Sequence, residues 1–420
     1  MSGGVVFKRN NAYAATSMAA NLLFPLAAIP FLTRCLGADA FGELAIAQAT
    51  AVIFCQVVDY GFSLSGAREI AGNKVLSEIS LVYSKYQNAR LLLLIACALI
   101  FSLLLPTRIF SIDRSILILA VIPAGIGAFL QSNWFFQGRG LYGWLALANL
   151  MGKSLYLAVS IWVVKEPQDI GWAAAAFGGS YLVSGVISWV ATLMLFKVTW
   201  SRPTDFSEMI VTIRRGTKSF ISLALLSIHM QLVILLTGHF VDSKSAGLLS
   251  VLDKMARGLS SLSVPIANTA FPVMSDLLSR DIERAKVTRS QLSKVMVSYG
   301  LVCLVGIAVF GAWAVGMLFK VNVATGLDNI TKIVSLLPIF IAIGVVNGGL
   351  TLVPAGFDSE YLASIAFAET MALIVFFATV FWIPKYSGVI TIVVAEGCMA
   401  VAFYLFARSR MGILFGIERV

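Results

Sequence analysis

The residues of this 420-residue chain that could do chemistry are ionisable groups inside long apolar stretches. Residues 249–275 are long and apolar enough to cross a bilayer, yet they include Asp253, Lys254 and Arg257. A charged side chain in a membrane span costs about 2.5–3.5 kcal/mol on insertion scales, so it normally faces a partner or a water-filled cavity. A helix over this stretch would have one polar, cationic face formed by Ser250, Lys254, Arg257, Ser261 and Asn268.

These charges differ in whether a partner lies nearby in the sequence. Asp253 and Arg257 are four residues apart and can pair within a helix. Lys254 has no acid at that spacing, so it is favoured as the free cation. Lys153 lies well inside another apolar stretch, where its charge faces either a cavity or a structural partner.

Four further charges lie within or beside apolar runs. Glu369 and Glu396 stand alone in theirs, and they are interpreted as counter-ions for the cations in other spans, as cation sites, or as structural contacts. Asp59 and Arg68 bracket a segment with two glycines, which predicts either a break before an amphipathic helix or an ion pair that fixes the loop. The expected gating and charge network consists of Asp59, Arg68, Asp253, Glu369 and Glu396.

Polar residues near the start of each half complete the expected binding set. Asn21 follows Ser17 at helical spacing and precedes Pro25, which is expected to kink or break its helix together with Pro30. Arg34 ends the same stretch as an interfacial or a cavity charge, and Gln231 lies on one face with Ser227. The substrate-binding residues that we expect are Lys254, Arg257, Lys153, Arg34, Gln231 and Asn21.

The sequence contains no recognisable catalytic constellation. It has no phosphate-binding loop for ATP, no His or Cys spacing typical of a metal site, and no plausible Ser-His-Asp set. We therefore expect no catalytic residue, metal or cofactor. Energy is then expected from an H+ or Na+ gradient, from the membrane potential, or from the substrate itself.

The composition places these charges in a polytopic membrane protein. The chain is 59% hydrophobic and 12% charged, whereas a soluble domain is about 25% charged. A span needs about 20 apolar residues. This length predicts twelve membrane helices at 12–33, 41–63, 89–107, 115–137, 142–164, 171–196, 217–240, 246–272, 294–318, 331–354, 361–383 and 387–407.

Basic residues predict the orientation of these spans. With the N-terminus cytoplasmic, the inner segments and adjoining span ends hold 20 of the 31 Lys and Arg, the outer ones hold 8, and the other 3 (Lys153, Lys254 and Arg257) lie deeper within spans. This bias predicts that both termini are cytoplasmic, and it explains the net charge of +10 without nucleic acid.

The loop before the seventh span divides the chain into two expected lobes of six helices, at 1–200 and 217–420, joined by a linker at 201–216. Residues 33–46 weakly resemble 237–251, with Gly42 matching Gly247. Transporters built from repeats place their substrate site between the halves.

Five motifs resemble one family of transporters. They are Leu36-Gly37-Ala38-Asp39-Ala40-Phe41-Gly42, Asp59-Tyr60-Gly61-Phe62, Ala67-Arg68-Glu69-Ile70-Ala71, Trp134-Phe135-Phe136-Gln137-Gly138 and Ala270-Phe271-Pro272. The chain resembles the polysaccharide-transporter branch of the multidrug/oligosaccharidyl-lipid/polysaccharide (MOP) exporter superfamily, and in particular a Wzx-type O-antigen flippase. Arg139 departs from the pattern, because relatives often have an acidic residue there.

The resemblance implies an all-α, MATE-like fold of two six-helix lobes around a central cavity, working by alternating access. It implies a substrate linked to undecaprenyl diphosphate, moved from the cytoplasmic to the periplasmic leaflet of a bacterial inner membrane. Membrane lipids, a polysaccharide polymerase and a chain-length regulator are the other expected partners, and no nucleic acid is expected. Two alternatives stay open, a MATE-like multidrug or cation antiporter and, less favoured, a membrane-embedded polymerase or ligase.

Overall fold

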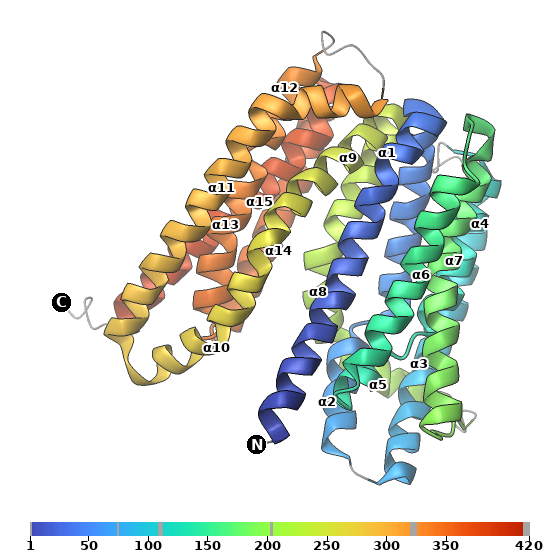
Figure 1. Ribbon diagram of the computed structural model, residues 1–420, viewed down its shortest axis with the longest axis vertical. Helices are drawn as coiled ribbons and strands as arrows, with labels where there is room; N and C mark the ends of the chain where they lie inside the picture. The colour runs from blue at the N-terminus through green and yellow to red at the C-terminus, as the bar shows by residue number, and fades with distance from the viewer. Residues whose placement is uncertain (1, 74, 108–111, 202–204, 320–325, 415–420) are drawn as a thin grey trace. The chain divides into compact units, whose positions relative to one another are not determined.

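The computed structural model describes residues 2–73, 75–107, 112–201, 205–319 and 326–414, and these residues form helices without strands (Figure 1). Contacts group the chain into two compact units, unit 1 (Met1–Gly247) and unit 2 (Leu248–Val420). This division falls after residues 201–216, because α8 (Phe206–Phe240) continues through that region and packs against α1 (Ser2–Asp59). The division into lobes at 1–200 and 217–420 stays a prediction.

Unit 1 contains α1, α8 and the helices between them, in which α4 packs against α7 and α6 packs against both α1 and α7. The intervening elements are α2 (Phe62–Gly72), α3 (Leu76–Leu104), α4 (Arg114–Leu130), α5 (Asn133–Gly138), α6 (Tyr142–Trp162), the 3-10 turn η1 (Pro167–Asp169), α7 (Ile170–Val190) and the π-helical turn η2 (Ala191–Leu195). α9 (Ser243–Ser260) begins in unit 1 and ends in unit 2.

Unit 2 is centred on α13 and η4, which pack against both α11 and α15. Its elements are the 3-10 turn η3 (Ser261–Ser263), α10 (Val264–Arg280), α11 (Ile282–Phe319), α12 (Leu327–Val334), α13 (Leu337–Gly344), the π-helical turn η4 (Val345–Leu352), α14 (Asp358–Val380) and α15 (Pro384–Leu414).

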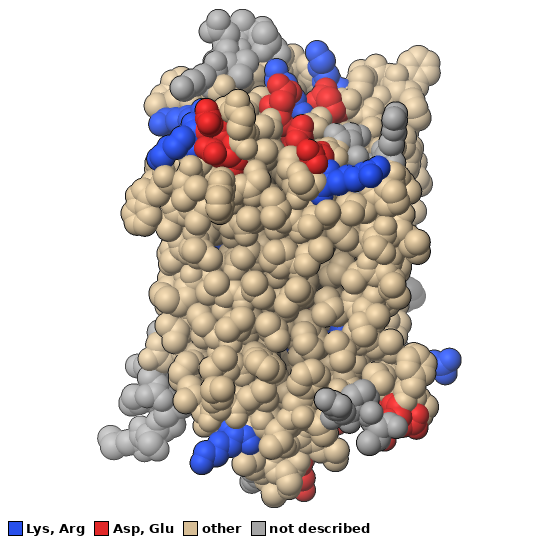
Figure 2. Space-filling model, turned by 90° about the vertical axis from the view of Figure 1, so that its right-hand side faces the viewer, with Lys and Arg blue, Asp and Glu red and all other residues tan. Residues whose placement is uncertain are grey.

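Within the described ranges, nine helical segments are long and apolar enough to cross a membrane. One of them, Leu23–Gly72, contains part of the expected span 12–33 and all of 41–63, and the other eight each correspond to one expected span. In the region of the expected span 217–240, the structure has a shorter apolar helical segment, Ser227–Phe240. The polytopic all-α class is confirmed, and charged side chains gather at the two ends of the face shown in Figure 2, with an uncharged band between.

Two local expectations require correction. The expected helix 246–272 is interrupted by η3, so its polar residues do not form one continuous helical face. The expected break at Pro25 and Pro30 does not occur, because α1 continues through both prolines, and its non-helical backbone lies at Gly37 (φ 74°, ψ −179°). Glycine accepts this positive φ without the steric cost that a Cβ would add.

The expected break after Asp59 is confirmed. α1 ends at Asp59, Tyr60 and Gly61 have φ of 48° and 70°, and α2 starts at Phe62. A positive φ is uncommon for tyrosine, and the Tyr60 ring stacks on Phe220 of α8 with 4.3 Å between centroids.

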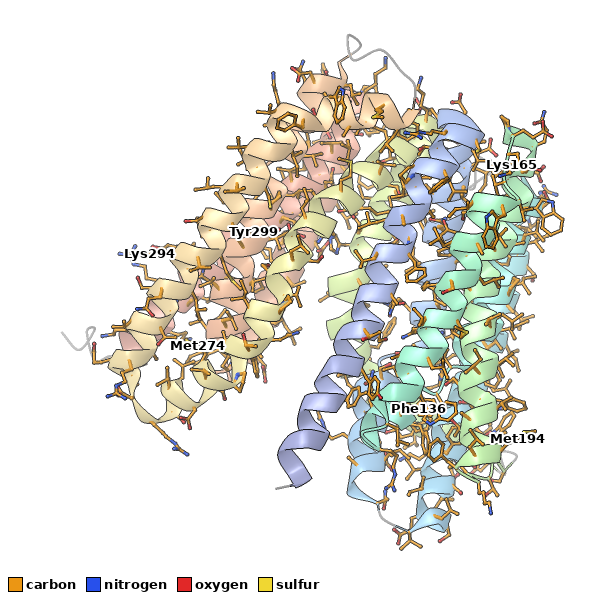
Figure 3. All side chains as sticks on the ribbon, viewed as in Figure 1. Phe136, Lys165, Met194, Met274, Lys294 and Tyr299 are labelled. Atoms are coloured by element: carbon orange, nitrogen blue, oxygen red, sulfur yellow. The ribbon has the colours of Figure 1, made fainter. Side chains whose placement is uncertain are left out.

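Three family motifs converge on one cluster, which we call the α2–α3–α5 cluster. It is formed by buried aromatic and aliphatic side chains, including Phe62, Ile70, Tyr83, Tyr86, Trp134, Phe135 and Phe136. Burying one large apolar side chain contributes about 1.5–3 kcal/mol, so this packing anchors α2 more strongly than an exposed ion pair of about 0–1 kcal/mol. In Figure 3, Phe136 marks this end of unit 1 and Lys165 lies at the opposite end.

Close contact with a neighbouring element explains why several positions are glycine. A Cβ on Gly138 would lie 2.5 Å from the carbonyl oxygen of Ala67, and a Cβ on Gly66 would lie 3.0 Å from the Trp134 ring. The two glycines matched by the weak internal repeat also meet, because a Cβ on Gly247 would lie 2.8 Å from the Cα of Gly42. Glycine at positions 138 and 247 allows backbones to approach each other directly, and glycine at position 66 leaves room for the Trp134 ring.

Two aspartates cap helices outside the spans. The Asp205 carboxylate accepts bonds from the hydroxyl and the backbone N–H of Ser207 at 2.6 and 2.9 Å, which holds the pKa of Asp205 below its ordinary 3.8. Asp113 caps α4 in the same way through the backbone N–H and hydroxyl of Ser115, and its pKa is also lowered. These bonds satisfy N–H groups that a helix start leaves unpaired.

Candidate functional site

The clearest charged constellation lies in unit 2 and joins α9 to α15. Arg257 Nε is 2.7 Å from Asp253 Oδ1, one helical turn away, and Arg257 Nη1 is 2.8 Å from Glu396 Oε1. The carboxylate side chains are nearly buried, with exposed fractions of 9% for Asp253 and 4% for Glu396, whereas Arg257 is 33% exposed. A planar guanidinium offers five N–H donors in a fixed geometry, so it can bind both carboxylates at once.

This arrangement changes the interpretation of the cationic face. Arg257 is a neutralised cation, because it contacts two carboxylates and the three side chains together carry a net charge of −1. Its Nη2 is nevertheless buried without a hydrogen-bond partner, so one donor is left for a further acceptor. Lys254 on α9 and Glu369 on α14 are both half-buried.

A second constellation lies in unit 1 around Lys153 of α6. The Lys153 ammonium is 4.4 Å from the centre of the Tyr181 ring and 5.8 Å from that of Phe177, both on α7. Aromatic faces attract a cation electrostatically, by about 2 kcal/mol or more when the pair is desolvated. One turn before Lys153, Asn149 donates to Ser17 Oγ of α1 at 2.6 Å. The sequence left open whether Lys153 faces a cavity or a structural partner, and in the structure its partners include two aromatic rings.

Further polar bonds fasten α1 to its neighbours in unit 1. Gln48 donates to Tyr156 Oη of α6 at 3.0 Å, and Gln56 donates to Ser227 Oγ of α8 at 3.0 Å. Gln231, one turn after Ser227 on α8, is half-buried. Asn21 and Arg34 are exposed on α1.

The remaining expected pair lies at the α1–α2 break. The Ser63 hydroxyl donates to Asp59 Oδ2 at 2.8 Å, and Arg68 is exposed on α2. Asp59 thus contacts a side chain in the first turn of α2.

Of the expected site residues, Asp253, Arg257 and Glu396 meet in unit 2. Lys153 belongs to unit 1, and the binding and gating roles of the set stay predictions.

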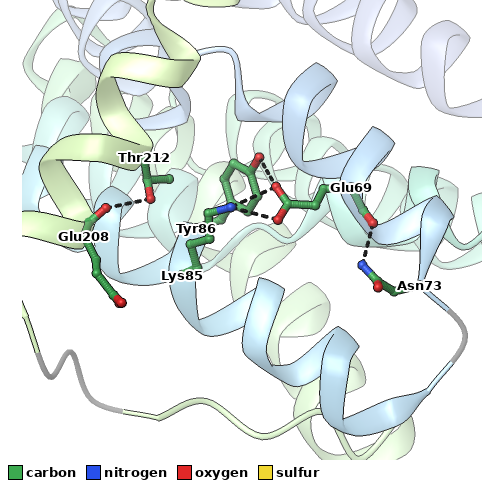
Figure 4. Close-up of polar contacts among 6 residues, drawn as sticks. All are labelled: Glu69, Asn73, Lys85, Tyr86, Glu208 and Thr212. Carbon is green, nitrogen blue, oxygen red and sulfur yellow. Dashed lines mark hydrogen bonds and ion pairs between the residues drawn. The ribbon is translucent and has the colours of Figure 1, made fainter.

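Sequence reasoning missed a polar network on the third family motif, Ala67-Arg68-Glu69-Ile70-Ala71. Lys85 Nζ of α3 contacts both carboxylate oxygens of Glu69 at 2.7 and 3.0 Å, and Tyr86 Oη donates to Glu69 Oε2 at 2.8 Å (Figure 4). Asn73 also donates to the backbone oxygen of Glu69 at 2.9 Å. Lys85 and Tyr86 are consecutive residues of α3, but nothing in the sequence around them indicates that they contact a residue of α2.

Arg90 stands at the inner end of the expected span 89–107, and the count of basic residues places it with the inner segment before that span. In the structure its side chain is 1% exposed. Its guanidinium donates to the carbonyl oxygen of Gln131 at 2.7 Å and to that of Ala128 at the end of α4. The final carbonyls of a helix lack intrahelical partners, so a buried cation there completes the helix end.

Comparisons with known proteins agree with this architecture. The family model described as "Polysaccharide biosynthesis protein" matches residues 7–278, and the chain therefore belongs to this family. A protein of Escherichia coli (strain K12) named "Putative O-antigen transporter" is 25% identical over 423 residues, which cover 96% of this chain and 97% of that protein. A protein of the same name in Shigella dysenteriae is 26% identical over 296 residues, covering 68% of this chain and 72% of that protein.

Solved structures show the same fold. An inward-facing multidrug resistance MATE family transporter of the MOP superfamily has a TM-score of 0.74 at 16% identity, with 97% of this chain and 99% of that chain covered. A MOP superfamily transporter from Pyrococcus furiosus has a TM-score of 0.57 at 16% identity, covering 97% and 96%. The chain is a multi-pass membrane transporter with a MATE-like fold, which confirms the resemblance drawn from its motifs.

Proposed function

We propose that this transporter moves an oligosaccharide repeat unit linked to undecaprenyl diphosphate, such as an O-antigen unit, from the cytoplasmic to the periplasmic leaflet of the bacterial inner membrane. The observation that carries the proposal is the nearly full-length match to a relative named for O-antigen transport. Lys153, Lys254 and Arg257 within apolar stretches support an anionic cargo. The basic bias of 20 to 8 supports cytoplasmic termini.

In this proposal Arg257 binds the diphosphate by exchanging partners. Its unpartnered Nη2 is the first donor offered to a phosphate oxygen. A diphosphate there repels Asp253 and Glu396, which already contact the same guanidinium. Cargo binding therefore weakens the contact between α9 and α15, and this gives alternating access a physical trigger.

The other proposed roles follow the chemistry of the side chains. Lys254 and Lys153 supply further positive charge, while exposed or half-buried polar groups contact the sugars. The proposed sugar and headgroup contacts are Arg34, Gln231 and Asn21, and the proposed gating residues are Asp59, Arg68, Asp253, Glu369 and Glu396.

The membrane potential is sufficient to bias this export. Moving one charge across 100 mV is worth about 2.3 kcal/mol, so a diphosphate of charge about −2 moving outward gains roughly 4–5 kcal/mol. H+ or Na+ antiport would add to this driving force. A polysaccharide polymerase and a chain-length regulator are the proposed downstream partners, because the exported unit is their substrate.

A second candidate is MATE-like antiport of drugs or cations. The two nearly buried carboxylates, Asp253 and Glu396, favour it because they leave their cluster with net negative charge.

The test is complementation of a deletion strain with the intact gene, with Lys254→Ala/Arg257→Ala, and with Lys385→Ala as an exposed control. We expect the deletion to lose surface polysaccharide and to accumulate lipid-linked single units on the cytoplasmic side. The double variant should reproduce that defect when its expression is raised to the protein level of the intact gene, whereas the control should restore the polymer. Normal polymer in the deletion strain, together with drug hypersensitivity, would favour the antiporter instead.

A further inference from the structure

Unit 2 contains a cavity of about 490 Å³ bordered by α11, α13, η4 and α15. This volume falls in the range of about 300–1,000 Å³ that is typical of small-molecule sites. The cavity is lined by Arg289, Ser290, Ser293, Lys294, Phe340, Ile343, Asn347, Ala400, Val401 and Tyr404. None of the site residues discussed above belongs to this lining.

The polar lining is suited to an anion. Arg289 Nη2 donates to Asn347 Oδ1 at 2.5 Å, which holds the guanidinium at the cavity wall, while its Nε is buried without a hydrogen-bond partner. Lys294 is exposed on α11 (Figure 3), and two serine hydroxyls lie between the cations in sequence. Among the described lining residues, two side chains are cationic and none is acidic.

Two of the helices that border the cavity, α11 and α15, indicate how deep it lies in the membrane. α11 changes from a charged segment to an apolar one just after Lys294, and the antiparallel α15 changes from apolar to basic between Tyr404 and Arg408. Both changes occur beside the cavity. A cavity at two such transitions lies where lipid headgroups meet the hydrocarbon.

The apolar wall leads away from these charges along surfaces that a membrane would cover. Val302 and Val305 on α11 are 69% and 57% exposed, and Val401 on α15 is 56% exposed. Exposed apolar side chains on a membrane-spanning helix can pack against the acyl chains of lipids. A single ligand that reaches both surfaces needs an anionic head and an apolar tail.

We propose that this cavity binds the phosphate headgroup of an anionic phospholipid from the surrounding leaflet, with Arg289 and Lys294 as its ligands. Basic pockets between membrane helices on the cytoplasmic side are suited to such headgroups. The site is separate from the cluster at Arg257, and the proposal does not rest on the identity of the cargo.

The test uses the full-length protein reconstituted in phosphatidylcholine vesicles that contain phosphatidylglycerol, followed by native mass spectrometry of the lipids it retains. We expect one phosphatidylglycerol to be retained by the unaltered protein. Arg289→Ala/Lys294→Ala should reduce its occupancy by at least about tenfold, the change that corresponds to 1.4 kcal/mol. Because Lys294 is exposed, Lys294→Glu tests the same site with little risk to folding.

The matched control is Arg280→Ala/Arg284→Ala, which removes the same charge from the neighbouring α10–α11 region. Both side chains are highly exposed and pair with Asp276 and Asp281, so occupancy should stay within about twofold of the unaltered protein. Equal loss in both double variants would overturn the site in favour of diffuse attraction. Retention of phosphatidylcholine as readily as phosphatidylglycerol, or displacement of the lipid by inorganic phosphate at equal concentration, would also overturn it.

Discussion

Replacing Arg257 should reveal how much the α9–α15 cluster contributes to stability. At a charge separation of about 4 Å and an effective dielectric constant of about 20, each of its two ion pairs attracts by about 4 kcal/mol before desolvation is subtracted. Breaking a buried pair by removing one partner costs about 3–5 kcal/mol. Because Arg257 is 33% exposed, we predict that Arg257→Met lowers the free energy of unfolding by about 3 kcal/mol, at the low end of that range.

A double-mutant cycle separates the ion pair from the loss of a side chain. Glu396→Gln alone should cost about 1 kcal/mol, because Arg257 keeps its bond to Asp253. Arg257→Met alone leaves two nearly buried carboxylates without their cation, whereas Arg257→Met combined with Glu396→Gln leaves only one. The combined loss should therefore be smaller than the sum of the single losses by about 2 kcal/mol.

The assay is unfolding of the purified protein in mixed micelles, followed by circular dichroism as the denaturing detergent is increased. Lys385→Ala, at an exposed position on α15, should change the free energy by less than about 0.5 kcal/mol. Additive losses in the cycle would refute the reasoning, since they would mean that Arg257 and Glu396 do not interact in the folded protein.

Three other predictions concern unit 1. Arg90→Met should destabilise by about 3 kcal/mol in the same micelle assay, because buried carbonyls at the end of α4 lose a charged donor. Gly138→Ala should also destabilise in that assay, by about 1–3 kcal/mol, because its Cβ would lie 2.5 Å from the backbone oxygen of Ala67; Gly72→Ala, with nothing within 4 Å, should not. The pKa of Asp205 is lowered in the folded protein, so its cap stabilises α8 above pH 3.8 and is lost as the pH falls through the lowered value. Hydrogen exchange of the first turn of α8, corrected for intrinsic rates, should lose protection only in that acidic range.

Local properties of the sequence were sufficient to predict the class of protein and most of its helices. A span is recognised by the length and apolarity of one segment, and eight expected spans each correspond to one candidate membrane helix. The Asp253–Arg257 pair could also be predicted locally, because residues four apart lie one helical turn from each other. The break after Asp59 followed from local glycines, and the motifs identified the family.

Local rules did not predict where the backbone of two long helices is interrupted. The sequence alone predicted an unbroken helix over 246–272 and a disturbance at Pro25 and Pro30. The structure instead has a 3-10 turn at Ser261–Ser263 and a kink at Gly37. Tertiary contacts can sustain a helix through proline, or interrupt one at serine, in ways that propensity does not encode.

Only the tertiary structure decided which distant residues meet. Glu396 was one of two lone carboxylates, and its choice of Arg257 depends on how α15 packs beside α9. Arg90 is counted with the inner segment before the expected span 89–107, but the position of α3 against α4 buries it on backbone carbonyls. Sequence spacing fixes the face of a helix on which a side chain lies, whereas the rotation and offset between two packed helices fix its partner.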